Sequence, residues 1–69
     1  MTTWIVKKQA NGKTEYLSKV EVFGGFCLSY WIDSKYTCSR FASFLRADVV
    51  ANLIRTHEDV TGVCVEEAE

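Results

Sequence analysis

Four residues carry the side chains that most often do chemistry in small proteins: His57, Cys27, Cys38 and Cys64. Their composition of three cysteines and one histidine is that of a structural zinc site. Their spacings of eleven, nineteen and seven residues, however, contain no close Cys-x2–4-Cys pair. We therefore predict no metal site and no cofactor.

The same four residues do not form a recognisable catalytic pattern. His57 ends a helical segment and precedes Glu58, a position typical of a histidine that caps a helix. Cys27 and Cys64 lie within apolar strand-like patterns, where a free cysteine serves as a small core residue. The chain has no glycine-rich phosphate loop and no paired carboxylate motif. We predict that it has no catalytic residues and is not an enzyme.

Composition narrows the range of partners and locations. The chain has 69 residues, with eight Lys and Arg against nine Asp and Glu, a net charge of −1. This balance argues against a dedicated duplex-binding protein, because such proteins carry a basic excess. The longest apolar run is far shorter than the roughly 20 residues of a membrane helix, and no signal-peptide pattern is visible. An odd number of cysteines is typical of a reducing compartment, so we expect a cytoplasmic protein that does not bind membranes.

The segment that must position everything else is Phe41–His57, the only one with a clear helical period. Ser43 is placed to cap the helix, because its hydroxyl can accept a hydrogen bond from a free N–H of the first turn. Apolar residues recur at three- and four-residue spacing and define one buried face: Phe44, Ala47, Val50, Ala51 and Ile54.

The remainder of the chain is typical of short strands separated by glycine-containing turns. Asn11-Gly12 predicts a tight hairpin turn, and Gly24-Gly25 a second one. Alternation in the second strand is mixed, which indicates a bulge or break near Ser18-Lys19. The predicted strands are Thr2–Lys8, Lys13–Phe23, Phe26–Ile32 and Val63–Val65.

These elements predict a single α+β domain over residues 1–69, with residues 66–69 as a candidate disordered acidic tail. The architecture is a small antiparallel sheet of three or four strands, with one helix packed on one face. The order along the chain is three strands, a helix and a strand. The predicted core is Ile5, Leu17, Val20, Leu28, Tyr30, Phe41, Ala47, Val50, Ala51, Ile54, Val63 and Val65.

Nine aromatic residues are more than one helix can cover, which favours a binding surface. We predict that contact with a partner is made by Trp4, Phe26, Tyr30, Trp31 and Tyr36. The partner is another protein or a second copy of the chain, and an unpaired sheet edge would serve either. The alternative is a single-stranded nucleic-acid-binding protein in which sheet aromatics stack on bases beside scattered lysines.

The layout also resembles small proteins of bacteriophage and prophage genomes. The resemblance rests on an initial WIVKK strand, a strand ending in Trp31-Ile32-Asp33, then Cys38 and Phe41, and a capped helix containing Ala47 before a short last strand. Proteins of this kind are accessory factors, and some of similar size, anti-CRISPR proteins among them, bind and block host enzymes or defence systems. The resemblance implies an inhibitor or adaptor in the host cytoplasm and carries over no functional residue.

Overall fold

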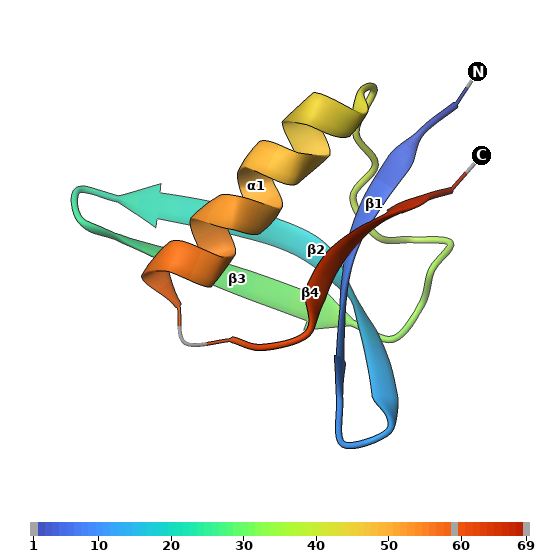
Figure 1. Cartoon of the computed structure of the whole chain (residues 1–69), viewed down its shortest axis with the longest axis horizontal. Coiled ribbons are helices and arrows are strands. Elements are labelled where there is room, and N and C mark those ends of the chain that lie inside the picture. The colour runs from blue at the N-terminus through green and yellow to red at the C-terminus, as the bar shows by residue number, and fades with distance from the viewer. Residues whose placement is uncertain (1, 59, 69) are drawn as a thin grey trace.

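The computed structural model describes residues 2–58 and 60–68, which form an α+β domain with a four-stranded antiparallel sheet (Figure 1). The order of strands across the sheet is β3-β2-β1-β4, and α1 lies across one face. This confirms the predicted class and the order of three strands, a helix and a strand. The elements are β1 (Trp4–Ala10), β2 (Lys13–Phe23), β3 (Phe26–Ile32), α1 (Phe44–His57) and β4 (Val63–Glu67).

Two tight turns connect the first three strands, as the sequence predicts. Asn11 and Gly12 adopt φ values of 55° and 75°, the left-handed conformation that a two-residue hairpin of this kind requires. Gly24 and Gly25 close the second hairpin, which pairs Phe23 with Phe26. The β2–β3 hairpin extends beyond the end of β1 (Figure 1).

The predicted irregularity in β2 is a register shift between Leu17 and Lys19. Leu17 pairs with Trp31 and Lys19 with Tyr30, so Ser18 has no opposite residue. The extra residue changes which side chains of β2 share a face. The shift explains why Leu17 is buried beneath α1 and why Val20, an odd number of residues later, packs against the same core.

The core lies between α1 and the sheet. Ser43 caps α1 by accepting a hydrogen bond from the Arg46 N–H at 3.2 Å, as predicted. Ala47, Ala51 and Ile54 are fully buried on the inner face of the helix. They pack against strand residues Val6, Leu17, Cys27 and Val63.

The predicted assignment to the core is wrong for two residues, Leu28 and Tyr30, which are 42% and 40% exposed. They lie on the sheet face opposite α1, which we call the far face, whereas their neighbour Cys27 is buried under the helix. A strand of apolar residues on both faces gives no indication of which face the helix will cover. Cys27 and Val6 belong to the core instead.

The far face is covered in part by the loop of residues 33–43. The Ser39 N–H donates to the Leu17 carbonyl at 2.9 Å, and backbone hydrogen bonds of 2.9 and 2.8 Å join Trp4 to Phe41. Cys38 in this loop is buried, and so is Ile5, which alternates with Val6 and therefore lies on the far face.

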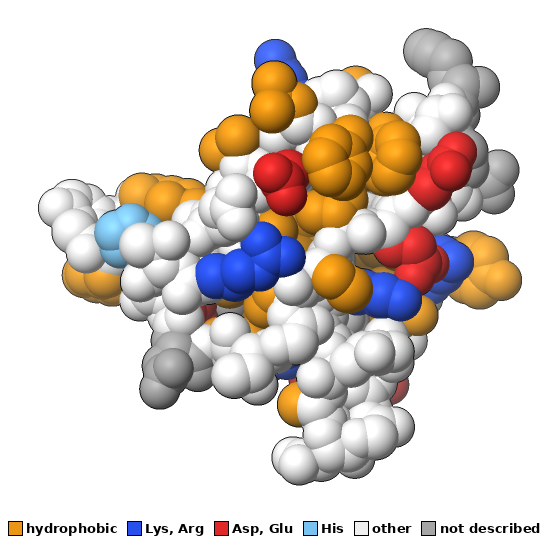
Figure 2. Space-filling view, in the orientation of Figure 1, with side chains coloured by type: hydrophobic (Ala, Val, Ile, Leu, Met, Phe, Trp, Pro, Cys, Tyr) orange, Lys and Arg blue, Asp and Glu red, His pale blue; other side chains and the backbone are white. Residues whose placement is uncertain are grey.

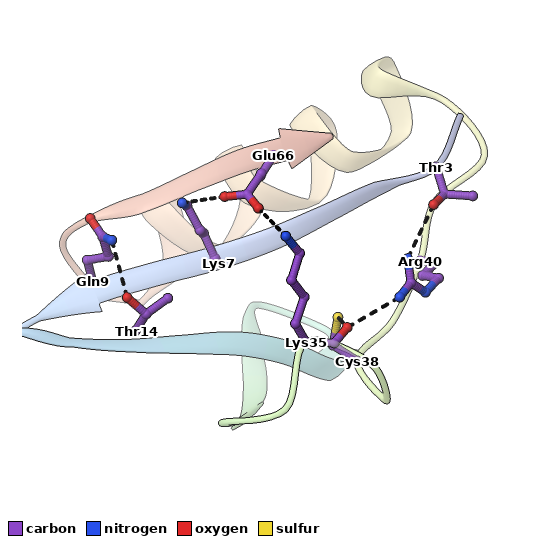
Figure 3. A network of polar contacts seen from close by, with 8 residues as sticks. All are labelled: Thr3, Lys7, Gln9, Thr14, Lys35, Cys38, Arg40 and Glu66. Atoms are coloured by element: carbon purple, nitrogen blue, oxygen red, sulfur yellow. Dashed lines mark hydrogen bonds and ion pairs between the residues drawn. The ribbon is translucent and has the colours of Figure 1, made fainter. Parts of the chain in front are cut away.

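Figure 3 shows an ion-pair network that fixes this loop to the sheet. Glu66 on β4 pairs with Lys7 on β1 and, at 2.8 Å, with Lys35 of the loop. These contacts lower the pKa of Glu66, through the hydrogen bond from Lys35 first and that from Lys7 second. The same carboxylate raises the pKa of both lysines.

The last strand is longer than the sequence predicts, because β4 continues to Glu67. Glu66 and Glu67 are therefore part of the sheet, a correction to the predicted tail, while Glu69 lies outside the described residues. The Ala68 N–H also donates to the Thr3 carbonyl at 2.8 Å. Within the described residues, no helix is long and apolar enough to cross a membrane.

Candidate protein-binding surface

The part of the far face that the loop leaves open carries a row of apolar side chains. Strand pairing places Lys19 beside Tyr30, Glu21 beside Leu28 and Phe23 beside Phe26, and paired residues share a face. The four large apolar members are Phe23, Phe26, Leu28 and Tyr30, exposed by 46%, 59%, 42% and 40%. We call these four residues the apolar strip.

Contacts within the strip hold its side chains in place. The rings of Phe23 and Phe26 lie with centroids 5.3 Å apart at an interplanar angle of 35°. The Tyr30 hydroxyl donates to Glu21 at 3.0 Å, a contact that raises the pKa of the phenol. Lys19 Nζ lies 5.1 Å from the centre of the Tyr30 ring. The strip therefore presents ordered aromatic surface, which costs little side-chain entropy on binding.

The strip borders a sheet edge that, within residues 2–58 and 60–68, lacks the usual protection. Strand β3 is the outermost on its side and has the sequence FCLSYWI, with no charged residue and no proline. Lysines, prolines or covering segments normally protect such an edge from pairing with other strands. An extended segment of another chain can therefore add to β3 without meeting a charge on the strand itself.

The opposite edge of the sheet is protected. Strand β4 carries the carboxylates of Glu66 and Glu67. The guanidinium of Arg55, in the last turn of α1, donates to the Val63 carbonyl through Nε at 3.1 Å and Nη2 at 2.5 Å. A partner strand could therefore pair with the edge of β3 more readily than with the edge of β4.

The predicted contact residues are distributed over four places. Phe26 and Tyr30 belong to the apolar strip, and Tyr36 is 87% exposed in the loop that follows β3. Trp31 is half-buried on the α1 side, where its indole N–H donates to Ser29 at 2.8 Å and Lys8 lies 4.7 Å from its ring centre. Trp4 packs against the core. The structure brings only Phe26 and Tyr30 of these five together on one surface.

A second apolar surface lies beside α1 and was not predicted. A groove of about 370 Å³ is lined by Phe41, Leu45, Arg46, Val49 and Val50. Leu45 and Val49 are 70% and 58% exposed. Figure 2 shows hydrophobic side chains gathered on the surface near the N-terminal end of α1. The spacing of Leu45 and Val49, one helical turn apart but off the core face, is the sequence signal that could have found it.

Two of the cysteines considered for chemistry lie in surroundings that disfavour their reactive form. Burial is the main cause that raises the pKa of Cys27 and of Cys38, so the reactive thiolate is disfavoured at both. Cys27 Sγ lies 3.5 Å from a carboxylate oxygen of Glu58, which adds to this effect. His57 is exposed in the last turn of α1. Over residues 2–58 and 60–68, no three His, Cys, Asp or Glu side chains are grouped to hold a metal ion.

Comparison with family models, with curated proteins and with solved structures found no significant match to this chain.

Proposed function

We propose that this protein is a small non-catalytic protein-binding module of the phage or prophage accessory type, which binds and inhibits or adapts a bacterial host protein in the cytoplasm. The observation that supports it is the apolar strip. Four large apolar side chains, each 40–59% exposed, lie together on the part of the far face that the loop of residues 33–43 leaves open. Ordered apolar surface of this kind on a small domain is typical of a contact site.

The chemistry of the strip suits a protein partner. Aromatic and leucine side chains supply most of its area, and the two charged neighbours, Lys19 and Glu21, lie 3.7 Å apart and largely compensate each other. A partner that covers the strip therefore desolvates little uncompensated charge. The host surface that fits it is apolar, with polar groups at its rim.

Binding of single-stranded nucleic acid is the second candidate function. It is supported by two aromatic rings that each have a lysine beside them: Tyr30 with Lys19, and Trp31 with Lys8. These rings lie on opposite faces of the sheet, however, so one strand of nucleic acid cannot stack on both. Each lysine also pairs with a glutamate, at 3.7 Å in both cases. The strip therefore lacks the continuous basic groove that such binding uses.

A pull-down from bacterial lysate with tagged wild type and two charge variants tests the proposal. Leu28→Lys places a charge within the strip, whereas Val49→Lys makes the same change on the second apolar surface, beside α1. We expect a protein partner that survives nuclease treatment, is retained by Val49→Lys and is lost by Leu28→Lys. Circular dichroism of both variants confirms that the fold is kept.

Two results would contradict the proposal. Equal retention by Leu28→Lys and wild type would remove the strip from the contact, and loss of every retained protein on nuclease treatment would favour nucleic acid. Alanine variants of His57 and of each cysteine should keep their partner, because a binding module needs none of these groups for chemistry.

A further inference from the structure

We infer that the unprotected edge of β3 pairs with β3 of a second copy of this chain, and that the resulting dimer places two apolar strips side by side on one continuous face. That the two adjacent strips bind a host protein together rests on the proposed function. The pairing itself is measured independently.

The first argument is the backbone of β3. Residues of an antiparallel strand bond alternately to the neighbours on either side, and a two-residue hairpin loop closes with a hydrogen-bonded pair. Leu17 pairs with Trp31, but its carbonyl accepts from the Ser39 N–H instead of from β3. This pair is therefore of the non-hydrogen-bonded type, so Phe26, Leu28 and Tyr30 are the residues that bond β2. The N–H and C=O groups of Cys27, Ser29 and Trp31 then point to the open edge. These groups can bond a strand that has the same pattern.

The second argument is self-complementarity. The strand has seven residues, and Ser29 is the central one. An antiparallel pair with its two-fold axis at Ser29 places Leu28 beside Tyr30 of the partner subunit and Phe26 beside Ile32 of the partner subunit. All seven residues overlap, apolar side chains meet on the far face, and no charges of like sign are opposed, because β3 has none.

The third argument is closure. A two-fold interface uses the same surface on both copies and stops at two. The remaining edges of the dimer are both β4, where Glu66, Glu67 and the Arg55–Val63 hydrogen bonds oppose further pairing. The chain therefore forms a dimer of defined size and not a fibre.

The fourth argument is area. From the exposed fractions of its four side chains, one strip offers on the order of 350 Å², given that large apolar side chains expose about 150–250 Å² when fully open. Standard protein interfaces bury roughly 800 Å² on each partner. Two adjacent strips approach that value and one does not. Dimerisation thus supplies the surface that the proposed host contact needs.

Light scattering coupled to size exclusion, over protein concentrations from roughly 1 µM to 1 mM, tests the pairing, because small interfaces dissociate in this range. We expect the molar mass of the full chain to double across the series. Ser29→Pro removes the central edge N–H and should remain a monomer. A proline is tolerated where a strand edge faces solvent.

Oxidative cross-linking tests the register without relying on that variant. In the inferred dimer the two Ser29 Cα atoms lie about 5.5 Å apart, within reach of a disulfide. Ser29→Cys should therefore form a covalent dimer on a non-reducing gel. The controls are wild type, which shows whether its own cysteines cross-link, and Asp33→Cys, whose two copies lie more than about 20 Å apart in this register.

A wild type that stays monomeric at every concentration, with no Ser29→Cys cross-link, would overturn the inference. So would a dimer that Asp33→Cys cross-links as readily as Ser29→Cys. Loss of the host partner in Leu28→Lys together with a monomeric wild type would overturn the pairing and leave the proposed function standing. A cross-linked dimer whose retained proteins do not depend on Leu28 would support the pairing and remove the proposed function.

Discussion

Three glycine-to-alanine substitutions separate two physical costs that this fold imposes on its turns. Gly62, which precedes β4, and Gly12, in the first hairpin, both adopt φ of 75°. An alanine Cβ at Gly12 would meet no atom within 4 Å, whereas at Gly62 it would collide with the backbone carbonyl of Gln9. Gly25 has neither a positive φ nor a neighbour within 4 Å. The three sites therefore form a graded series.

The magnitudes follow from these geometries. A left-handed alanine costs about 1–2 kcal/mol, of which the reduced freedom of the unfolded chain returns about 0.4–1 kcal/mol. We expect Gly12→Ala to lower the free energy of unfolding by about 1 kcal/mol. Gly62→Ala must in addition displace the Gln9 backbone and weaken its N–H hydrogen bond to the Gly62 carbonyl, now 3.2 Å long. We therefore expect Gly62→Ala to lower the free energy of unfolding by about 2–4 kcal/mol.

Thermal unfolding followed by circular dichroism measures the series. A loss of 1 kcal/mol lowers Tm by about 4–8 °C in a domain of this size. Gly12→Ala should then melt about 4–8 °C below wild type and Gly62→Ala at least about 8 °C below it, with Gly25→Ala close to wild type. Equal melting temperatures for Gly62→Ala and Gly12→Ala would refute the close approach of residue 62 to β1.

Two further substitutions test the core and the ion-pair network. Ile54 is fully buried between α1 and the sheet, so Ile54→Asp buries an unpaired charge. The free energy of that burial exceeds the roughly 3–10 kcal/mol expected to stabilise a domain of 69 residues. We expect no cooperative melt by circular dichroism, and a folded, soluble variant would contradict the placement of the helix. Glu66→Gln should lower stability at pH 7 by no more than about 1 kcal/mol, given the partial exposure of the pair. Because the folded state lowers the pKa of Glu66 below its ordinary value of 4.5, this stabilisation is present above that value and is lost as the pH falls through the lowered pKa. The wild type and Glu66→Gln should therefore converge in melts carried to pH values below the lowered pKa, and a difference that persists there would exclude the carboxylate as its source.

Local signals in the sequence predicted most of the elements. Asn11-Gly12 specifies its turn because both residues accept positive φ, and Ser43 specifies the helix start through one hydrogen bond. Mixed alternation around Ser18 correctly indicated a bulge. In each case the determining interaction lies within a few residues, so a single sequence contains it.

The faces of β3 were harder to assign, because they depend on contacts between distant segments. Leu28 and Cys27 are adjacent and both apolar, and only the path of α1 across the sheet decides that Cys27 is buried and Leu28 exposed. The order of strands is likewise set by pairing between β1 and β4, which lie at opposite ends of the chain. The unpredicted groove at Leu45 and Val49 has the same origin, since helical spacing does not reveal how wide the buried face is.

The position of the apolar strip follows from how few segments are available to cover the sheet. One helix can cover one face, and the loop of residues 33–43 is bonded to the sheet away from the β2–β3 hairpin. Its hydrogen bonds to Leu17 and Trp4, and the Lys35–Glu66 pair, fix the loop over β1 and β4. The far side of β2 and β3 is left open, and there the sequence places phenylalanine, leucine and tyrosine instead of charge. A surface that the described chain leaves uncovered, and that is apolar where solubility alone would favour polar residues, is the reason that we propose binding at this face.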